Sequence, residues 1–326
     1  MTLVDTVRGE VAPEALGKVL MHEHIFVLSP EFVANYPEHD GFDEPVHVPE
    51  AIEKLRALKA AGIDTIVDPT VIGLGRYIPR VQRIAAEVDL NIVVATGLYT
   101  YNELPHYLSL RGPGTMLGGD DPMVAMFVGD LTDGIADTGV KAGVLKCATD
   151  EPGVTPGVER VLRAVAKAHR ETGAPIMTHT HAGTRRGLEQ QDVFESEGVD
   201  LTRVLIGHSG DTTDLDYLTA LADRGSLLGM DRFGIDSFLP FEDRVATVAA
   251  LCERGYAGSM VLSQDASCYM DWLEAPVREA VLPNWHYLHI TEDVLPALRA
   301  RGVAESDLTK MLVDNPQRFL TRGSGY

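Results

Sequence analysis

Residues 140–181 read VKAGVLKCATDEPGVTPGVERVLRAVAKAHRETGAPIMTHTH, which is two apolar runs around one amphipathic segment. Val140–Ala148 and Ala174–His181 are nearly continuous apolar runs, as expected of parallel strands that are covered by helices. Between them, apolar residues recur at helical spacing from Thr155, and Gly173 follows where the helix should end. The stretch therefore predicts one strand–helix–strand unit.

The same alternation continues along the chain in both directions. Further strands are predicted at Val19–Ile25, Ile63–Thr70, Asn91–Tyr99, Arg203–Ser209, Ser226–Phe233 and Met260–Asp265. Further helices are predicted from Pro49 to Gly62 and over 76–88, 121–138, 184–197, 212–224, 241–254 and 290–302. Eight such units without a linker predict a single (β/α)8 barrel over residues 1–326, because a doubly wound sheet, the alternative, seldom needs eight evenly spaced units.

The composition of the chain argues against several classes of protein. The 326 residues carry 28 basic and 48 acidic side chains, a net charge of −20, and such an acidic surface repels nucleic acid. The sequence has neither an apolar run of membrane-spanning length nor a signal-peptide pattern at its start, so we expect no membrane association. Three cysteines cannot form a disulfide framework, which favours a reducing, cytoplasmic location.

Polar side chains gather where the predicted strands end, which is the catalytic end of such a barrel. His22 and His24 lie at the end of the first strand, and residues i and i+2 of a strand share a face. The later strands end in Lys146, His179 with His181, His208 and Asp265. A lone lysine, aspartate or histidine at such a place has an ordinary structural explanation, but the whole set favours a metal site.

Seven stretches together resemble one known family, and the resemblance covers nearly the whole chain. They are Met21-His22-Glu23-His24, Ala95-Thr96-Gly97-Leu98-Tyr99, Ala142-Gly143-Val144-Leu145-Lys146, Gly187-Leu188-Glu189-Gln190-Gln191, Ile206-Gly207-His208-Ser209-Gly210-Asp211-Thr212, Met230-Asp231-Arg232-Phe233-Gly234 and Asp271-Trp272. The chain resembles the amidohydrolase superfamily and, within it, the phosphotriesterase-like lactonases.

The resemblance implies a ligand set for two divalent metal ions. His22, His24 and Asp265 would bind the more buried ion, His179 and His208 the other, and Lys146, carbamylated by carbon dioxide to N6-carboxylysine, would bridge both. It favours His179 over His181, which would lie near the rim. An ammonium would repel two cations, whereas a carbamate is an anion with two oxygens. Nitrogen and oxygen donors suit zinc, cobalt, manganese or iron.

The resemblance also implies a reaction, attack of a metal-bridging hydroxide on a lactone carbonyl. Tyr99 would donate a hydrogen bond near the carbonyl oxygen or the hydroxide, and Asp265 would accept the proton and pass it to the leaving alkoxide. Arg232 would hold a loop over the site or orient the substrate. Its alternative role is an ion pair with Asp231 or a loop carboxylate.

The expected substrates are N-acyl-homoserine lactones and γ- or δ-lactones, which would make the protein a quorum-quenching enzyme. We expect the long, partly aromatic loop from Ala266 to about His289 both to hold the acyl chain, with Trp272 nearest the substrate, and to help to form a homodimer. Organophosphate triesters would be weaker side substrates, and a primary phosphotriesterase is the closest alternative. Two rivals are a Schiff-base lyase that uses Lys146 and a non-catalytic metal-binding barrel.

Other polar candidates receive no part in the chemistry. Strand alternation places Cys147 on the face opposite Lys146, against a helix, and Gln264 should point away from the metals. His169 falls on the apolar side of a helix and should be structural. The remaining histidines lie in predicted loops or helices and are assigned no role: His39, His47, His106, His286 and His289.

Overall fold

A parallel sheet of eight strands forms the centre of the protein in a computed structural model that describes residues 3–36, 38 and 41–326. In chain order the strands are β3 (Val19–Leu20), β5 (Thr65–Asp68), β6 (Asn91–Gly97), β7 (Val144–Thr149), β8 (Ile176–Thr180), β9 (Val204–Ile206), β10 (Leu227–Met230) and β11 (Met260–Leu262). Each strand pairs with the next one along the chain. This arrangement confirms the predicted (β/α)8 barrel.

The first and last strands close the barrel through a second pair of short strands. After a bend, β3 continues as β4 (His24–Val27), and β11 continues as β12 (Ser267–Met270); β4 and β12 pair in parallel. The Asp265 backbone N–H donates to the His22 carbonyl at 3.0 Å, and the His24 N–H donates to the Ala266 carbonyl at 2.8 Å. Barrel closure thus places His22 and His24, the first predicted metal ligands along the chain, beside Asp265, the last one.

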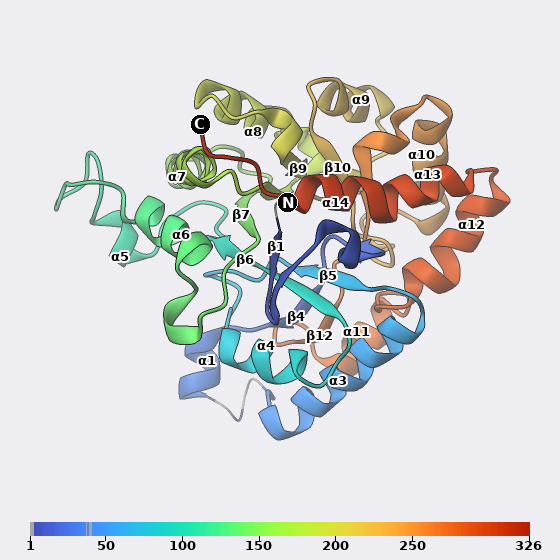
Figure 1. Cartoon of the computed structure of the whole chain (residues 1–326), viewed down its shortest axis with the longest axis horizontal. Coiled ribbons are helices and arrows are strands. Elements are labelled where there is room, and N and C mark those ends of the chain that lie inside the picture. The colour runs from blue at the N-terminus through green and yellow to red at the C-terminus, as the bar shows by residue number, and fades with distance from the viewer. Residues whose placement is uncertain (1–2, 37, 39–40) are drawn as a thin grey trace.

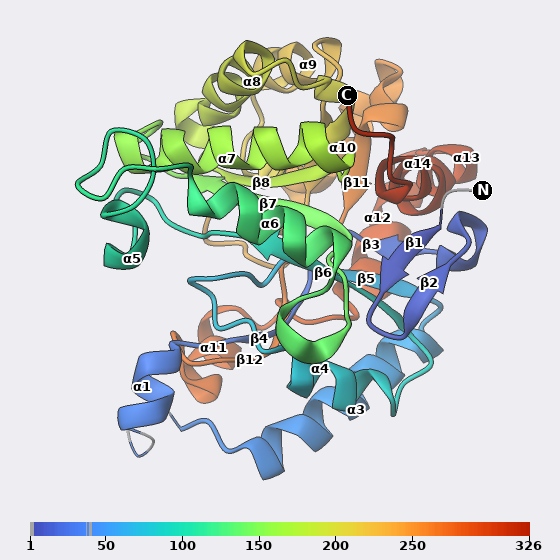
Figure 2. The same ribbon diagram turned by 60° about the vertical axis from the view of Figure 1, so that its left-hand side comes forward.

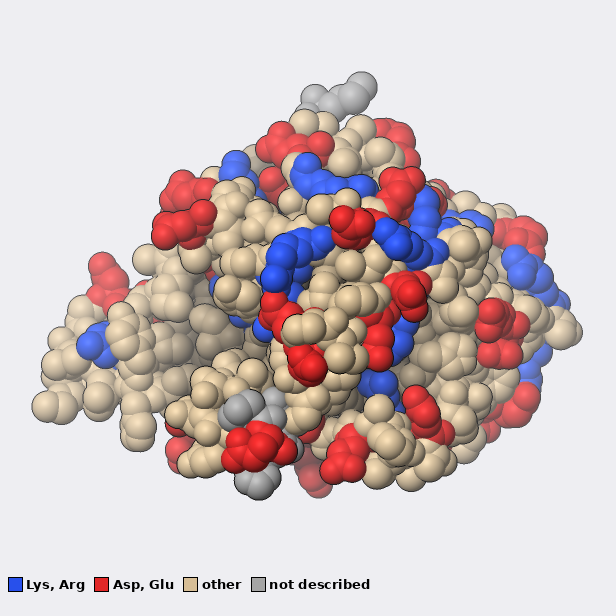
Figure 3. Space-filling view, turned by 90° about the horizontal axis from the view of Figure 1, so that it is seen from below, with Lys and Arg blue, Asp and Glu red and all other residues tan. Residues whose placement is uncertain are grey.

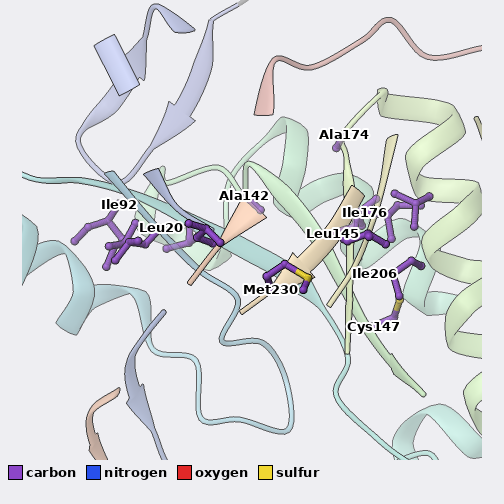
Figure 4. Close-up of a cluster of buried hydrophobic side chains, with 14 of the residues drawn as sticks. Leu20, Ile92, Ala142, Leu145, Cys147, Ala174, Ile176, Ile206 and Met230 are labelled. Atoms are coloured by element: carbon purple, nitrogen blue, oxygen red, sulfur yellow. The ribbon is translucent and has the colours of Figure 1, made fainter. Parts of the chain in front are cut away.

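Helices surround the sheet, as Figures 1 and 2 show. The principal ones are α3 (Glu44–Ala60), α4 (Ile78–Ala85), α6 (Pro122–Thr132), α7 (Pro156–Thr172), α8 (Arg186–Ser196), α9 (Leu215–Asp223), α10 (Phe241–Glu253) and α12 (Leu295–Ala300). Helix α7 follows its sequence signals: the Thr155 side chain caps its N-terminus, and Gly173 ends it with φ 71°. Buried apolar side chains between strands and helices form the larger core cluster, which includes Cys147 (Figure 4).

Several shorter elements were not predicted, because each is too short to show a periodicity. They are the hairpin β1–β2 (Val4–Thr6 and Gly9–Val11), α1 (Pro30–Asn35), α5 (His106–Ser109), α11 (Ala275–Val281), α13 (Glu305–Thr309) and α14 (Asn315–Leu320). In Figure 2 the hairpin and α14 lie at one end of the barrel, and α1 and α5 lie toward the other. Within the described residues, no helix is both long and apolar enough to span a bilayer.

The surface charge is mixed on the face that Figure 3 shows. Acidic and basic side chains are interspersed there, separated by uncharged residues. Many acidic groups have a basic neighbour, as in the pair between Arg80 and Glu44 at 2.8 Å. Exposed ion pairs of this kind add little stability. The net charge of −20 acts mainly on solubility and on which charged molecules the surface attracts.

Two strand predictions were wrong in ways that matter for the site. The predicted strand Val19–Ile25 bends at residues 21–23, because the buried Glu23 side chain turns toward the last strand. The two histidines therefore converge across a bend rather than along one strand. Lys146 lies inside β7 instead of at its end, since pairing with β8 continues to Thr149.

Some helix and loop boundaries also differ from prediction. Helix α3 begins at Glu44, because Pro45 occupies its first turn and Pro49 is tolerated one turn later. The predicted helix over 121–138 ends at Thr132, before Gly134 with φ 126°. The predicted helix over 290–302 begins as a π-helical turn, Ile290–Val294. The predicted loop over residues 266–289 contains β12 and α11.

We predict that Glu23→Ala lowers the free energy of unfolding by about 3 kcal/mol. The Glu23 carboxylate accepts hydrogen bonds from Ser263 Oγ at 3.0 Å and from the backbone N–H groups of Gln264 and Ala266, both at 2.9 Å. The variant leaves these buried donors without a partner at the point of barrel closure. Urea unfolding measures the change, and the half-exposed Glu50 gives a matched control as Glu50→Ala. Equal midpoints for the two variants would contradict this account of the bend.

Candidate active site

One cavity of about 450 Å³ lies at the carboxyl ends of the barrel strands. It is lined by every side chain to which the sequence analysis gave a part in the chemistry: His22, His24, Tyr99, Lys146, His179, His208, Arg232, Asp265 and Trp272. They come from segments spread over 250 positions of the chain. The fold therefore brings together the complete candidate set.

Asp231, directly after β10, holds two of the cavity's imidazoles. Its Oδ2 accepts a hydrogen bond from His22 Nδ1 at 2.9 Å, and its Oδ1 accepts from His208 Nδ1 at 3.0 Å and from the His208 backbone N–H at 2.8 Å. These bonds fix the tautomer of both rings and turn each Nε2 toward the cavity. A histidine held in this way is typical of a metal ligand.

The other two imidazoles are held by different groups. His24 Nδ1 donates to Thr70 Oγ1 at 2.7 Å, and the Thr70 hydroxyl donates in turn to Asp68 at 2.5 Å. His179 Nε2 donates to Asp150 Oδ2 at 2.6 Å. Each ring therefore keeps one nitrogen for the cavity, and all four histidines have the orientation that metal binding requires.

Asp265 adds a carboxylate to these imidazoles, and together with Lys146 they form what we call the floor of the cavity. Its Oδ1 lies 3.4 Å from His22 Nε2 and 3.2 Å from His24 Nε2, and these three residues could together hold a metal ion. Burial opposes charge on His24, but the hydrogen bonds and charges of Asp265 and Asp68 outweigh it and raise the pKa of His24 to about 9. The two carboxylates beside His24 therefore favour positive charge at this side of the cavity.

Burial keeps the other imidazoles neutral. It lowers the pKa of His22, lowers that of His179 to about 4 and holds that of His208 well below its ordinary value. Neutral imidazole is the form that coordinates metal ions. These three rings are therefore ready to bind at neutral pH without first losing a proton.

Lys146 is fully buried at the centre of this group. Its Nζ lies 3.4 Å from His22 Nε2 and 3.3 Å from the Thr178 carbonyl, and burial lowers its pKa to about 8. The neighbouring strand approaches closely here, since a Cβ on Gly97 would lie 1.8 Å from the Lys146 carbonyl oxygen. An amine with a lowered pKa reacts more readily with an electrophile such as carbon dioxide.

Two of the candidate ligands have unusual backbone conformations. His208 has φ 59° and Asp265 has φ 55°, in the left-handed region that non-glycine residues rarely adopt. Among the described residues only Ala136 and Arg185 also combine a side chain with positive φ. Backbone strain of this kind persists where the surroundings impose it, most often at functional sites.

Arg232 joins the cavity to a buried charge network. It donates from Nη1 to Asp211 at 3.0 Å and from Nε to Asp265 at 3.1 Å, and Arg244 lies 2.7 Å from Asp211. Burial opposes its charge, but the two carboxylates raise the pKa of Arg232 further above its ordinary value. Of the alternatives for Arg232, pairing with a loop carboxylate is observed, whereas pairing with Asp231 is not, because both histidines occupy Asp231.

Tyr99 and Tyr101 share a hydrogen bond beside His179. The Tyr99 hydroxyl lies 3.5 Å from His179 Nδ1, the nitrogen that faces the cavity. Burial raises the pKa of Tyr99 well above its ordinary value and that of Tyr101 to about 12. Both phenols therefore keep their protons at neutral pH and can donate hydrogen bonds.

The upper wall of the cavity is apolar and comes mainly from the loops after β10 and β11. Its side chains are Val27, Leu74, Ile235, Phe238, Met270, Trp272, Leu273, Leu282 and Trp285. Trp272 is 54% exposed, whereas the Trp285 indole donates to the carbonyls of Gln264 and Asp265 at 2.9 and 3.0 Å. A polar floor under an apolar wall suits an amphiphilic ligand.

The residues set aside on sequence grounds lie elsewhere. His181 bonds Thr184 at 2.8 Å, and Cys147 packs in the core. His169 is buried against the Ala174 carbonyl at 2.7 Å, and the Gln264 amide accepts from the Ile290 N–H. His39 lies outside the described residues.

Sequence reasoning missed the groups that orient the ligands. Asp150 and Asp231 each directly follow a barrel strand, β7 and β10, so their position was a usable signal. Thr70 ends the predicted strand Ile63–Thr70 and carried the same signal. Glu23 carried none, because only the folded contacts reveal its partners. Tyr101 lies two residues after Tyr99 and could have been proposed with it.

We predict that Asp231→Asn weakens metal binding by about 10- to 100-fold. An amide cannot accept from both imidazoles at once, because one of its two oxygens becomes a donor nitrogen. Dialysis against a graded chelator series, followed by metal analysis, measures the loss. Asp89, 88% exposed in its side chain, gives the control Asp89→Asn. Unchanged retention in Asp231→Asn would show that the imidazoles do not depend on this carboxylate.

The chain is similar in sequence and in structure to known proteins. The model of the Phosphotriesterase family matches residues 2–320. A phosphotriesterase homology protein of Mycobacterium tuberculosis is 60% identical over 326 residues, which is 100% of both chains. An aryldialkylphosphatase of Saccharolobus solfataricus is 37% identical over 316 residues, 96% of this chain and 98% of its own. A solved structure of the phosphotriesterase from Mycobacterium tuberculosis, 60% identical, matches with a TM-score of 0.98 over 99% of this chain and 100% of its own.

Proposed function

Because this chain belongs to the phosphotriesterase family of metal-dependent hydrolases, we propose that it is a binuclear-metal lactonase acting on N-acyl-homoserine lactones and γ- or δ-lactones. The observation that carries the proposal is the cavity itself. Four oriented imidazoles, a carboxylate and a buried lysine form its floor, and an apolar wall stands over them. The floor supports hydrolysis, and the wall supports a substrate with an acyl chain.

In this proposal His22, His24 and Asp265 would hold one divalent ion, and His179 and His208 would hold a second. Lys146, as N6-carboxylysine, would supply an anionic ligand to both. The donor set contains only nitrogen and oxygen, which suits zinc, cobalt, manganese or iron. When bound, the ions supply Lewis acidity that activates water at neutral pH and polarises the carbonyl.

The protein's own groups position the substrate and move the proton. Tyr99 donates a hydrogen bond to the carbonyl oxygen as negative charge develops on it. Asp265 accepts the proton of the attacking water and passes it to the leaving alkoxide. Arg232 fixes the Asp265 carboxylate through its 3.1 Å hydrogen bond and keeps the loop after β10 over the site.

The apolar wall supports the proposed substrate class. Trp272 is half-exposed at the mouth of the cavity, where it can cover an acyl chain that extends outward. Phe238, 60% exposed, comes from the loop after β10 and lines the same cavity. By hydrolysing N-acyl-homoserine lactones the protein would act as a quorum-quenching enzyme.

A second candidate is primary phosphotriesterase activity. The aryldialkylphosphatase relative, 37% identical, favours it. A phosphoryl centre and a tetrahedral carbonyl centre place similar charge over the floor of the cavity, so one site can serve both reactions. We propose that triester hydrolysis is the weaker of the two. The Schiff-base alternative for Lys146 is disfavoured, because four oriented histidines have no part in it.

We also propose that the enzyme works as a homodimer in the reducing cytoplasm. The three cysteines are free, and Cys147 and Cys268 are buried. Large apolar side chains such as Phe32 and Tyr77 are more than half exposed and could be covered by a second copy.

We predict that Lys146→Ala retains less than half of the metal that the wild type binds, because the bridging anion is lost. Cys147→Ala is the matched control: it changes the adjacent, equally buried residue, which faces the core instead of the cavity. Metal analysis after gel filtration gives the comparison. Equal metal content in the two variants would remove the bridging lysine from the proposal.

We predict that kcat/KM is higher for lactones than for a phosphotriester and rises with acyl-chain length. Trp272→Ala should lower kcat/KM for long-chain lactones by about tenfold and leave short γ-lactones nearly unchanged. Steady-state kinetics on a lactone series beside one diethyl aryl phosphotriester provides the test. A phosphotriester preferred over every lactone would support the phosphotriesterase alternative instead.

A further inference from the structure

A second group of metal-binding side chains lies outside the active-site cavity. His286, His289 and Asp293 come from the segment that links α11 to α12, and their ligand atoms all lie within 4.8 Å of one another. The sequence analysis assigned no role to either histidine. None of the three lines the active-site cavity.

The three side chains already face one another. His289 is 2% exposed, and its Nδ1 lies 2.8 Å from Asp293 Oδ2. The centroids of the His286 and His289 rings are 5.9 Å apart, with planes at 68°. His286 Nδ1 accepts a bond from the Leu288 N–H at 3.3 Å, so the neutral ring carries its proton on Nε2 and would bind an ion through Nε2 after a change of tautomer. Three potential donor groups therefore lie within reach of a single ion.

We propose that His286, His289 and Asp293 form a third divalent-metal site, separate from the catalytic pair. Two imidazoles and one carboxylate suit zinc, nickel or copper(II) better than magnesium or calcium, which prefer oxygen ligands throughout. His286 and Asp293 are exposed, so water completes the coordination and the ion exchanges with solvent.

Local charge and protonation agree with this site. Burial, and then the neighbouring His289, lower the pKa of His286, so the ring is neutral at neutral pH. The site lies at the first turn of a helix, where the helix dipole disfavours cations. Asp293 supplies negative charge that offsets this effect, and the protein's net charge of −20 raises the local cation concentration.

The site adjoins the wall and floor of the active-site cavity. His286 directly follows Trp285, whose indole donates to the carbonyls of Gln264 and Asp265. The Ile290 N–H, one residue after His289, donates to the Gln264 side chain at 2.9 Å. An ion held by His286 on the loop and by His289 and Asp293 on the helix therefore fastens the segment that carries Trp285. The third ion has a structural role that stabilises this loop.

Equilibrium dialysis of the intact, metal-loaded enzyme against buffered free zinc tests the proposal. At micromolar free zinc the wild type should bind one zinc equivalent beyond its catalytic metals, with a rise in Tm. His286→Ala and Asp293→Asn should each lose that equivalent and the rise in Tm while they keep the catalytic metals. His286 is exposed, so its substitution leaves the fold intact.

Glu292→Gln is the matched control, because it removes the same charge from the adjacent residue and should keep the additional equivalent. The proposal is overturned if the wild type shows no additional equivalent at micromolar zinc, or if that equivalent survives both ligand substitutions. Because the catalytic metals are counted in the same samples, failure of the third site is distinguishable from failure of the proposed active site.

Discussion

The site depends on one contact, the pairing of the first barrel strand with the last. The Glu23 carboxylate accepts two backbone N–H groups and one hydroxyl from residues 263–266, and β4 then pairs with β12. This contact closes the barrel and, in the same few residues, sets His22 and His24 beside Asp265. Burying a carboxylate costs free energy. Burial raises the pKa of Glu23 well above its ordinary value, although hydrogen bonds from the three donors act to lower it. Fold closure and site assembly are therefore the same event.

Around that contact, the site is pre-organised by groups that never face the cavity. Asp231 orients two imidazoles, while Thr70 and Asp150 orient one each. Left-handed backbone conformations at His208 and Asp265 also help to aim these two side chains into the cavity. This arrangement holds the candidate ligands in place, so little ordering would remain to be done if a metal ion bound. The apolar wall, built from loops, is the part that can vary without disturbing the floor.

The sequence was sufficient for the barrel and for the inward-facing residues, because apolar runs at regular spacing depend on local chemistry. It was not sufficient for the bend at Glu23, whose partners lie about 240 residues away. Nor did it reveal Asp231, which bonds His22 across 209 residues. The position of Lys146 inside β7 follows from pairing with β8, a non-local property. The family resemblance supplied the roles of the ligands, which spacing alone left open between His179 and His181.

The central claim is that a carboxylated lysine and two metal ions sit on this floor. A crystal structure with anomalous diffraction measured at the metal absorption edge tests it most directly. The account predicts two anomalous peaks in the active-site cavity, one among His22, His24 and Asp265 and one between His179 and His208, with density for a carboxylate on Lys146 between them. A single peak, or two peaks beside an unmodified Lys146 amine, would contradict it.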